Sequence, residues 1–158
     1  MLKRLAILAA GLLAAAPVFA QNPRGEAKAA FAGKSVVIDY GRPSLKGRDM
    51  LGQAQVGQAW RLGADSATTL KTDADLAFGA VAVPKGEYVL RATKVADSQW
   101  QLNVLGKDDK RVADVPLAAS KLDANVEQFT IDLSAEKDKG QLKLRWGTTG
   151  LATSFTAK

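Results

Sequence analysis

The feature that most constrains the fold of this chain is an alternation of apolar and polar residues with a period of two. In the segment 87–93, one face is formed by Tyr88, Leu90 and Ala92, and charged and hydroxyl side chains are among the residues of the other. An extended strand turns successive side chains to opposite faces, whereas a helix repeats about every 3.6 residues. Three further segments show the same alternation, namely 99–104, 129–133 and 142–146. The pattern therefore predicts β-strands that each bury one face.

Turn-forming residues separate these segments and set the fold class. Near the N-terminus, residues 27–31 and 35–40 flank a short turn that contains Gly33, which predicts a β-hairpin. Strands that recur about every dozen residues with one apolar face are typical of an antiparallel β-sandwich or a flattened barrel. We expect little helix, with one short turn at most over 118–125. The predicted breaks are 84–86, 96–98, 106–109, 137–140 and 147–150.

The first twenty residues have the order of a cleavable signal peptide. A short basic start precedes an apolar run over 5–16, which is shorter than the roughly 18 to 20 residues that cross a bilayer. Val18 and Ala20 occupy the small-residue positions that a signal peptidase recognises. We expect residues 1–20 to be removed. Residues 21–158 would then form a single domain, periplasmic or secreted, without a lipid anchor because no cysteine follows the signal.

The sequence contains neither cysteine nor histidine. Without thiols the exported chain forms no disulfide and performs no thiol redox chemistry. Without imidazole it has no Ser-His-Asp arrangement, and zinc or copper sites that need thiolate or imidazole are excluded. The pair Asp73 and Asp75 lacks the glycine and the distal glutamate of a calcium loop. We therefore expect no metal site and no cofactor.

The charged residues do not form a surface for nucleic acid. Beyond the two basic residues of the signal peptide, the chain has 20 basic and 16 acidic residues. The two signs are mixed along the sequence, as in 107–111, so no continuous basic stripe arises. We expect no nucleic-acid partner and no transmembrane span in the mature chain.

One segment, 39–65, differs from the strand pattern because it is rich in glycine and in charged residues. It predicts a long structured loop over about residues 41–66. Long loops without secondary structure are uncommon in compact domains and are usually functional or disordered. The apolar residues Leu51, Val56 and Trp60 argue against disorder, because they can anchor the loop on the core.

This loop supplies the residues that we predict for a ligand site. A guanidinium group offers a rigid pair of donors to a carboxylate or phosphate, and an indole offers a flat face for stacking. Such a site would take a small anionic ligand or a saccharide. The candidate residues are Tyr40, Arg42, Lys46, Arg48, Asp49, Trp60, Arg61 and Asp65.

Two other interpretations of the loop remain open. In the first, its arginines bond carbonyls and carboxylates of the protein and Trp60 belongs to the core, since a long loop has many backbone groups to satisfy. In the second, the carboxylates of Asp39, Asp49 and Asp65 serve a hydrolase or lyase. Each of the three has a basic residue close by in sequence, which favours the charged form and disfavours a general acid.

Several segments together resemble a bacterial family called domain of unknown function 2911. They are 40–48 (Tyr-Gly-Arg-Pro-Ser-Leu-Lys-Gly-Arg), 59–65 (Ala-Trp-Arg-Leu-Gly-Ala-Asp), 68–69, 83–90 and the closing strand 142–146. The resemblance spans most of the chain after the signal peptide. It implies an exported, β-rich domain without an assigned activity. The sequence departs from the family pattern over 52–57, where a longer loop with proline and tyrosine is usual.

These observations favour a non-catalytic binding module of the cell envelope. Its ligand would be a small anionic molecule or a saccharide, or its partner another envelope protein. A hydrolase or lyase that uses the carboxylates of 39–65 is the first alternative, and a purely structural envelope domain is the second.

Overall fold

The computed structural model describes residues 15–17 and 20–158, so most of the predicted signal peptide lies outside the described residues. No helix in this described part is long and apolar enough to cross a membrane. Ten antiparallel strands form one sheet, and a single 3-10 turn, η1 (Lys107–Asp109), is the helical element of these residues. The predicted antiparallel all-β fold is confirmed. The strands are β1 (Arg24–Phe31), β2 (Lys34–Gly41), β3 (Ala59–Trp60), β4 (Thr69–Thr72), β5 (Leu76–Phe78), β6 (Val81–Val83), β7 (Gly86–Ala96), β8 (Gln99–Leu105), β9 (Arg111–Glu136) and β10 (Lys139–Ala157).

The predicted hairpin at the N-terminus is formed by β1 and β2. Phe31 pairs with Lys34, so the connection is a two-residue turn. Ala32 and Gly33 both have positive φ, at 48° and 82°. Two residues with positive φ are the requirement of the turn type that matches the twist of a tight hairpin. The alternation in β2 buries Val36 and Ile38, as expected for one apolar face.

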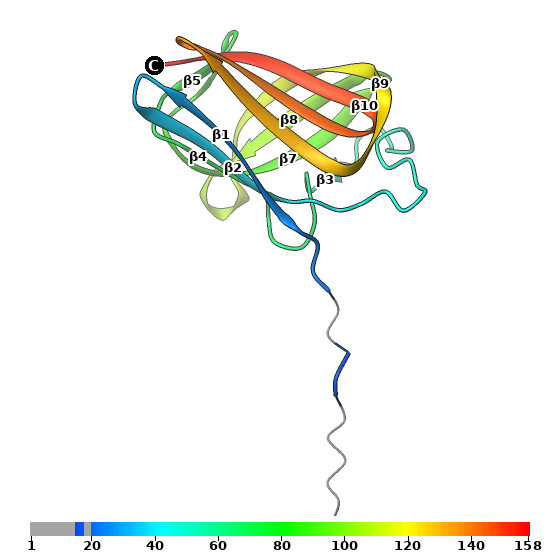
Figure 1. Cartoon of the computed structure of the whole chain (residues 1–158). Helices are drawn as coiled ribbons and strands as arrows, with labels where there is room; N and C mark the ends of the chain where they lie inside the picture. Colours follow the sequence, from blue (N-terminus) through cyan, green and yellow to red (C-terminus); the bar gives the residue numbers. More distant parts are fainter. Residues whose placement is uncertain (1–14, 18–19) are drawn as a thin grey trace, which may run out of the picture.

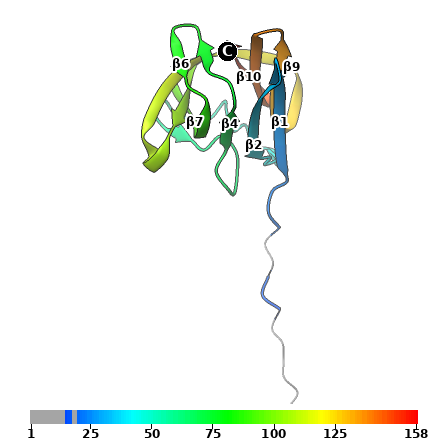
Figure 2. The same ribbon diagram turned by 90° about the vertical axis from the view of Figure 1, so that its left-hand side faces the viewer.

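The sheet folds over on itself into two layers without closing into a barrel. Its strand order is β1-β2-β4-β7-β8-β9-β10-β5-β6, and β3 pairs with β7 beside this path. Figure 2 shows β6 and β7 on one side of the molecule and β1, β2 and β9 on the other. The core lies between the layers and includes Phe129, Leu144 and Val115, each fully buried.

A long bent ribbon of β9 and β10 belongs to both layers (Figure 1). Residues 111–118 of β9 pair with β8, whereas residues 130–136 pair with the start of β10. The pairing is irregular on either side of Gly147, whose φ is +62°. Bulges of this kind bend a strand and let it change layers. The predicted break at 147–150 and the predicted helical turn at 118–125 are therefore wrong, because both stretches are bends within strands.

Four short strands, β3 to β6, did not stand out from the sequence. They contain two to four residues each, which is too short for an alternating pattern to be recognised. β4 joins β2 to β7 through the pairs Ile38 with Leu70 and Leu70 with Tyr88. The segment 42–68 between β2 and β4 contains β3 and is otherwise loop, in agreement with the long structured loop that was expected.

Candidate functional site

Tyr40, at the end of β2, connects this strand to β9 through its hydroxyl group. The hydroxyl accepts a hydrogen bond from the Ile131 N–H at 2.9 Å and donates one to the Ile131 carbonyl oxygen at 3.3 Å. Ile131 lies on the part of β9 that pairs with β10, so these backbone groups face away from that partner strand. Tyr40 is 3 % exposed. Its hydroxyl thus satisfies two backbone groups that no strand pairs with.

Arg42 also bonds to β9, at the two residues that precede Ile131. Its Nε donates to the Phe129 carbonyl oxygen at 3.2 Å, and its Nη2 donates to the Thr130 hydroxyl at 3.0 Å. A Cβ on Gly25 of β1 would lie 2.7 Å from the Arg42 Cδ and 2.9 Å from the Tyr40 ring. Glycine at this position therefore leaves room for both side chains to reach β9.

The 59–65 motif packs directly on the 40–48 motif. A Cβ on Gly41 would overlap the carbonyl oxygen of Ala64, so the two backbones meet at van der Waals distance. Leu62 is 1 % exposed and has a φ of +59°, a strained value for a leucine. The Thr68 hydroxyl donates to the Leu62 carbonyl oxygen at 2.6 Å and holds this turn in place. We call Gly41 and Arg42 together with residues 62–65 the anchored end of the segment.

The remaining charged candidates also bond to the protein itself. The Arg48 Nε donates to the Leu45 carbonyl oxygen, and the Arg61 Nη2 donates to that of Asp65. The Lys46 backbone N–H donates to the Glu127 carboxylate.

The three carboxylates of the segment each accept a hydrogen bond from an N–H group. Asp39 forms an ion pair with Arg24. Asp49 accepts from the Gly52 N–H at 2.9 Å, and Asp65 accepts from the Asn22 N–H at 2.8 Å. Within the described part of the chain, no three acidic side chains lie close enough together to hold a metal ion.

Trp60 lines a hollow of about 280 Å³, whereas Arg61 lines a separate one of about 350 Å³. The hollow at Trp60 differs from that at Arg61 because it is rich in aromatic side chains. All three tryptophans of the chain line this hollow, although they come from three separate elements, β3, β8 and β10. We call it the tryptophan hollow. Its lining residues are Met50, Leu51, Gln53, Ala54, Gln55, Gln58, Ala59, Trp60, Trp100 and Trp146. Of the eight predicted site residues, Trp60 alone is among them.

Aromatic contacts fix the orientation of the indole groups. Trp60 stacks on Trp146 with ring centroids 5.6 Å apart and planes 18° apart, and it meets Phe129 edge-on at 4.9 Å. The Trp146 Nε1 donates to the Glu127 carbonyl oxygen at 3.2 Å. Trp146 is buried, whereas Trp60 is half-buried. The stack therefore presents the Trp60 indole to the hollow on a rigid base.

The loop that forms the outer wall of the hollow is fastened to β7. The Gly57 N–H donates to the Lys94 carbonyl oxygen at 2.8 Å, and the Lys94 Nζ donates to the Ala54 carbonyl oxygen at 3.3 Å. Leu51 is 4 % exposed and anchors the loop on the core. The wall is thus preformed, as is usual for small-molecule sites.

Three glutamines supply the polar groups of the tryptophan hollow. Gln53, Gln55 and Gln58 are exposed, and none of their side-chain amides is hydrogen-bonded to another of the residues 15–17 and 20–158. Each amide offers two donor hydrogens and one acceptor oxygen. An aromatic face bordered by uncommitted amides matches a ligand that has apolar C–H faces and hydroxyl groups.

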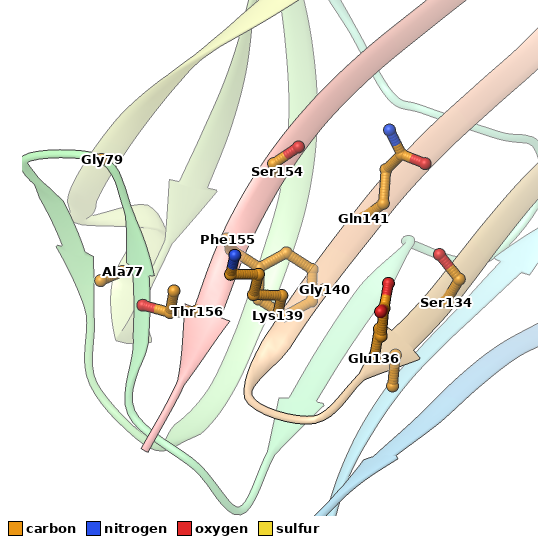
Figure 3. Close-up of a pocket in the computed structure, with 11 residues that line it drawn as sticks. Ala77, Gly79, Ser134, Glu136, Lys139, Gly140, Gln141, Ser154, Phe155 and Thr156 are labelled. Carbon is orange, nitrogen blue, oxygen red and sulfur yellow. The ribbon is translucent and has the colours of Figure 1, made fainter.

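A larger hollow, of about 670 Å³, shares no lining residue with the tryptophan hollow, and Figure 3 shows the residues that line it. It is bounded by the first residues of β10, 139–141, and by residues 154–156 of the same strand. These two stretches pair with β9 and β5 and not with each other. We call it the seam hollow, since it marks where the sheet remains open. Phe155 at its base is 4 % exposed, so little aromatic surface is available to a ligand there.

The sequence signal for the tryptophan hollow was present but scattered. Trp100 and Trp146 occupy the apolar faces of predicted strands, where a core position is the ordinary expectation for tryptophan. The glutamines fall in a loop without a recognisable motif. The three-dimensional meeting of β3, β8 and β10 is what brings these residues together.

A comparison with family models finds one match, to a family described as protein of unknown function (DUF2911), over residues 22–155. No curated protein and no solved structure matches the chain.

Proposed function

This chain belongs to the DUF2911 family of proteins of unknown function, and we propose that its domain is a non-catalytic binding module that takes a saccharide in the tryptophan hollow. The observation that carries the proposal is the meeting of all three tryptophans with three uncommitted glutamine amides. A sugar ring has one face of C–H groups that packs on an indole, and its hydroxyl groups bond to amides.

The state of the charged groups supports binding without catalysis. The carboxylates of Asp39, Asp49 and Asp65 all accept hydrogen bonds from N–H donors of the protein. None of the three lines the tryptophan hollow. A general acid or base has to reach the reacting atom within hydrogen-bond distance, so these carboxylates are poorly placed to act on a ligand in that hollow.

We assign the module to the periplasm or the cell exterior, on the sequence of residues 1–20. The start of the folded domain supports this assignment. The Asn22 N–H already bonds Asp65, and β1 begins at Arg24, so cleavage after Ala20 would leave the domain intact. Mass analysis of the protein recovered from a periplasmic extract should give Gln21 as the first residue; an intact Met1 would contradict the assignment.

Tryptophan fluorescence offers a direct test of the binding proposal. Because every tryptophan of the chain lines this hollow, a saccharide bound there should shift or quench the emission. We propose titration with neutral tetrasaccharides of glucose, galactose and N-acetylglucosamine. At least one should bind, with an affinity reduced about tenfold in Gln58→Ala, the expected effect of losing one hydrogen bond to a ligand whose group stays unpaired.

The seam hollow provides a matched control. Gln141→Ala removes the same kind of side chain from that hollow and should leave the affinity unchanged. A fluorescence response that Gln58→Ala and Trp60→Ala leave unaltered, or no response to any of the three sugars, would overturn the proposal.

A further inference from the structure

A second hollow of about 290 Å³ lies directly beside the tryptophan hollow. The two have a common wall, because Leu51 and Trp100 line both. We call it the lysine hollow. Its other lining residues are Gly52, Lys94, Ser98, Ala119, Ser120, Lys121, Thr148 and Thr149. Two ammonium groups and four hydroxyl groups therefore surround a space that adjoins an aromatic one.

The two lysines give the lysine hollow a positive charge. Lys94 lines the hollow, and its side chain is 15 % exposed, so most of it is buried. One Nζ hydrogen bonds the Ala54 carbonyl, and the nearest carboxylate, fully exposed Asp97, is 3.9 Å away. An ammonium group has three donors, so Lys94 retains a donor for a ligand. Within residues 15–17 and 20–158, Lys121 forms no ion pair.

The common wall itself carries a polar group. Trp100 is 3 % exposed, and its indole N–H makes no hydrogen bond to the described residues. No side-chain nitrogen or oxygen of those residues is both buried and unpaired. The Trp100 N–H is therefore open to one of the two hollows that Trp100 lines. A buried tryptophan usually finds a hydrogen-bond partner for its N–H group. A ligand that extends over Trp100 from one hollow to the other would provide such a partner.

Taken together, the two hollows are large enough for one ligand that extends over both. Ligand pockets generally begin at roughly 300 Å³, and each of these hollows lies just below that value. Together they fall within the range. Resting on the function proposed above, we infer that the ligand is an acidic saccharide, with a sugar ring on Trp60 and a carboxylate, sulfate or phosphate group in the lysine hollow.

Matched pairs of acidic and neutral sugars test this inference. The first pair is tetragalacturonate and its methyl ester, and the second is a galactose tetrasaccharide with and without 6-sulfate. The wild-type protein should bind at least one acidic member about tenfold more tightly than its neutral counterpart, since hydrogen bonds to charged groups are the strong ones. The preference should shrink as salt is raised, because ions screen charges at an accessible site.

Variants of the two lysines test whether the anionic group of the ligand binds in the lysine hollow. Lys121→Met keeps an unbranched side chain and removes the charge, so it should bring the affinity ratio of the pair close to one while neutral binding persists. Lys94→Met should lower the ratio as well, but it should also weaken neutral binding, because it removes the hydrogen bond that fastens the wall of the tryptophan hollow. Lys28→Met, which changes an exposed lysine on β1, should leave the ratio unchanged. Tryptophan fluorescence and calorimetry measure both affinities.

The failures of the two proposals are distinguishable. Neutral binding without preference for the acidic member, or a preference that survives both lysine variants, would overturn the acidic-saccharide inference and leave the binding module standing. No binding of any neutral or acidic probe would overturn both.

Discussion

Towards the two ends of the segment between β2 and β4, Arg42 and Arg61 bond carbonyl oxygens of the protein, whereas in its middle Gln55 and Gln58 border a hollow with their amides uncommitted. The anchored end also contains the strained Leu62 and the close contact of Gly41 with Ala64. Charged side chains thus stabilise the fold in one region, and neutral ones are available to a ligand in the other. Side-chain type alone is therefore a poor guide to the site; the partners that each group already has are decisive.

The largest expected difference between the two regions is in the free energy of unfolding lost when a glycine in each is replaced by alanine. Gly41→Ala places a methyl group on the Ala64 carbonyl oxygen, and overpacking against backbone should lower the free energy of unfolding by about 3 kcal/mol. Gly57→Ala, in the wall of the tryptophan hollow, meets no atom within 4 Å and is strained only by its φ of +87°. It should cost about 1 kcal/mol. Urea unfolding measures both; equal losses would contradict the distinction between the two regions.

The two tyrosines of the chain provide the next comparison. Tyr40→Phe leaves the Ile131 N–H and carbonyl without a partner inside the protein, which should cost about 2 kcal/mol. Tyr88→Phe removes one hydrogen bond to the Pro84 carbonyl at an exposed position, and water can replace it, so the loss should be smaller. If Tyr40→Phe unfolds at the same urea concentration as the wild type, the hydroxyl does not stabilise the contact between β2 and β9.

The glutamines should affect stability still less. Gln53→Ala, Gln55→Ala and Gln58→Ala remove exposed side chains without protein partners, and such changes usually stay within about 0.5 kcal/mol. Thermal unfolding followed by circular dichroism would show near-identical transitions. A loss as large as that of Tyr40→Phe in any of them would place that glutamine in the scaffold and remove it from the proposed site.

The smallest expected effect on stability concerns a carboxylate that lies outside both regions, Asp73, and this effect depends on pH. Hydrogen bonds from the Ser35 hydroxyl at 2.6 Å and from the Ser35 N–H at 3.3 Å hold the pKa of Asp73 below its ordinary value. A carboxylate whose pKa is lower in the folded state than in the unfolded state stabilises the fold at pH values above the unfolded pKa of about 3.9. This stabilisation is lost as the pH falls below that value. The effect is small because Asp73 is exposed.

Ser35→Ala should therefore lower the urea midpoint slightly at pH 7 and should differ from the wild type progressively less below about pH 4. Measurements at pH 7 and pH 3 are sufficient. A difference that grows on acidification would show that the hydrogen bond does not favour the charged carboxylate.

The sequence predicted best those strands and turns whose position depends on a single physical rule. The period of two located β7, β8 and the outer parts of β9 and β10, because each strand buries one face. The turn at Gly33 followed from the need for positive φ. Neither rule applies to the bend at Gly147, where a glycine serves a bulge within a strand and has the same sequence signature as a turn.

The candidate site was less accessible because it depends on contacts between distant residues. The segment 39–65 was selected by its length and its arginines, and Trp60 is the one member of that prediction that lines the tryptophan hollow. Trp100 and Lys121 are contributed by other strands, at positions that the alternation marks only as core or surface. No local pattern shows that an apolar position and a charged one will border the same space.

The ribbon of β9 and β10 also determines when the domain can fold. The first residues of β9 pair with β8, its later residues bond Tyr40 of β2 and Arg42 just after β2, and the last residues of β10 pair with β5. When the growing chain ends near residue 110, β8, β2 and β5 each lack the contact that β9 or β10 later provides. The core between the two layers is therefore still uncovered. Folding must wait for the C-terminal third of the chain. Contacts between residues far apart in sequence form slowly, so we expect the fold to stay incomplete until β9 and β10 have been made.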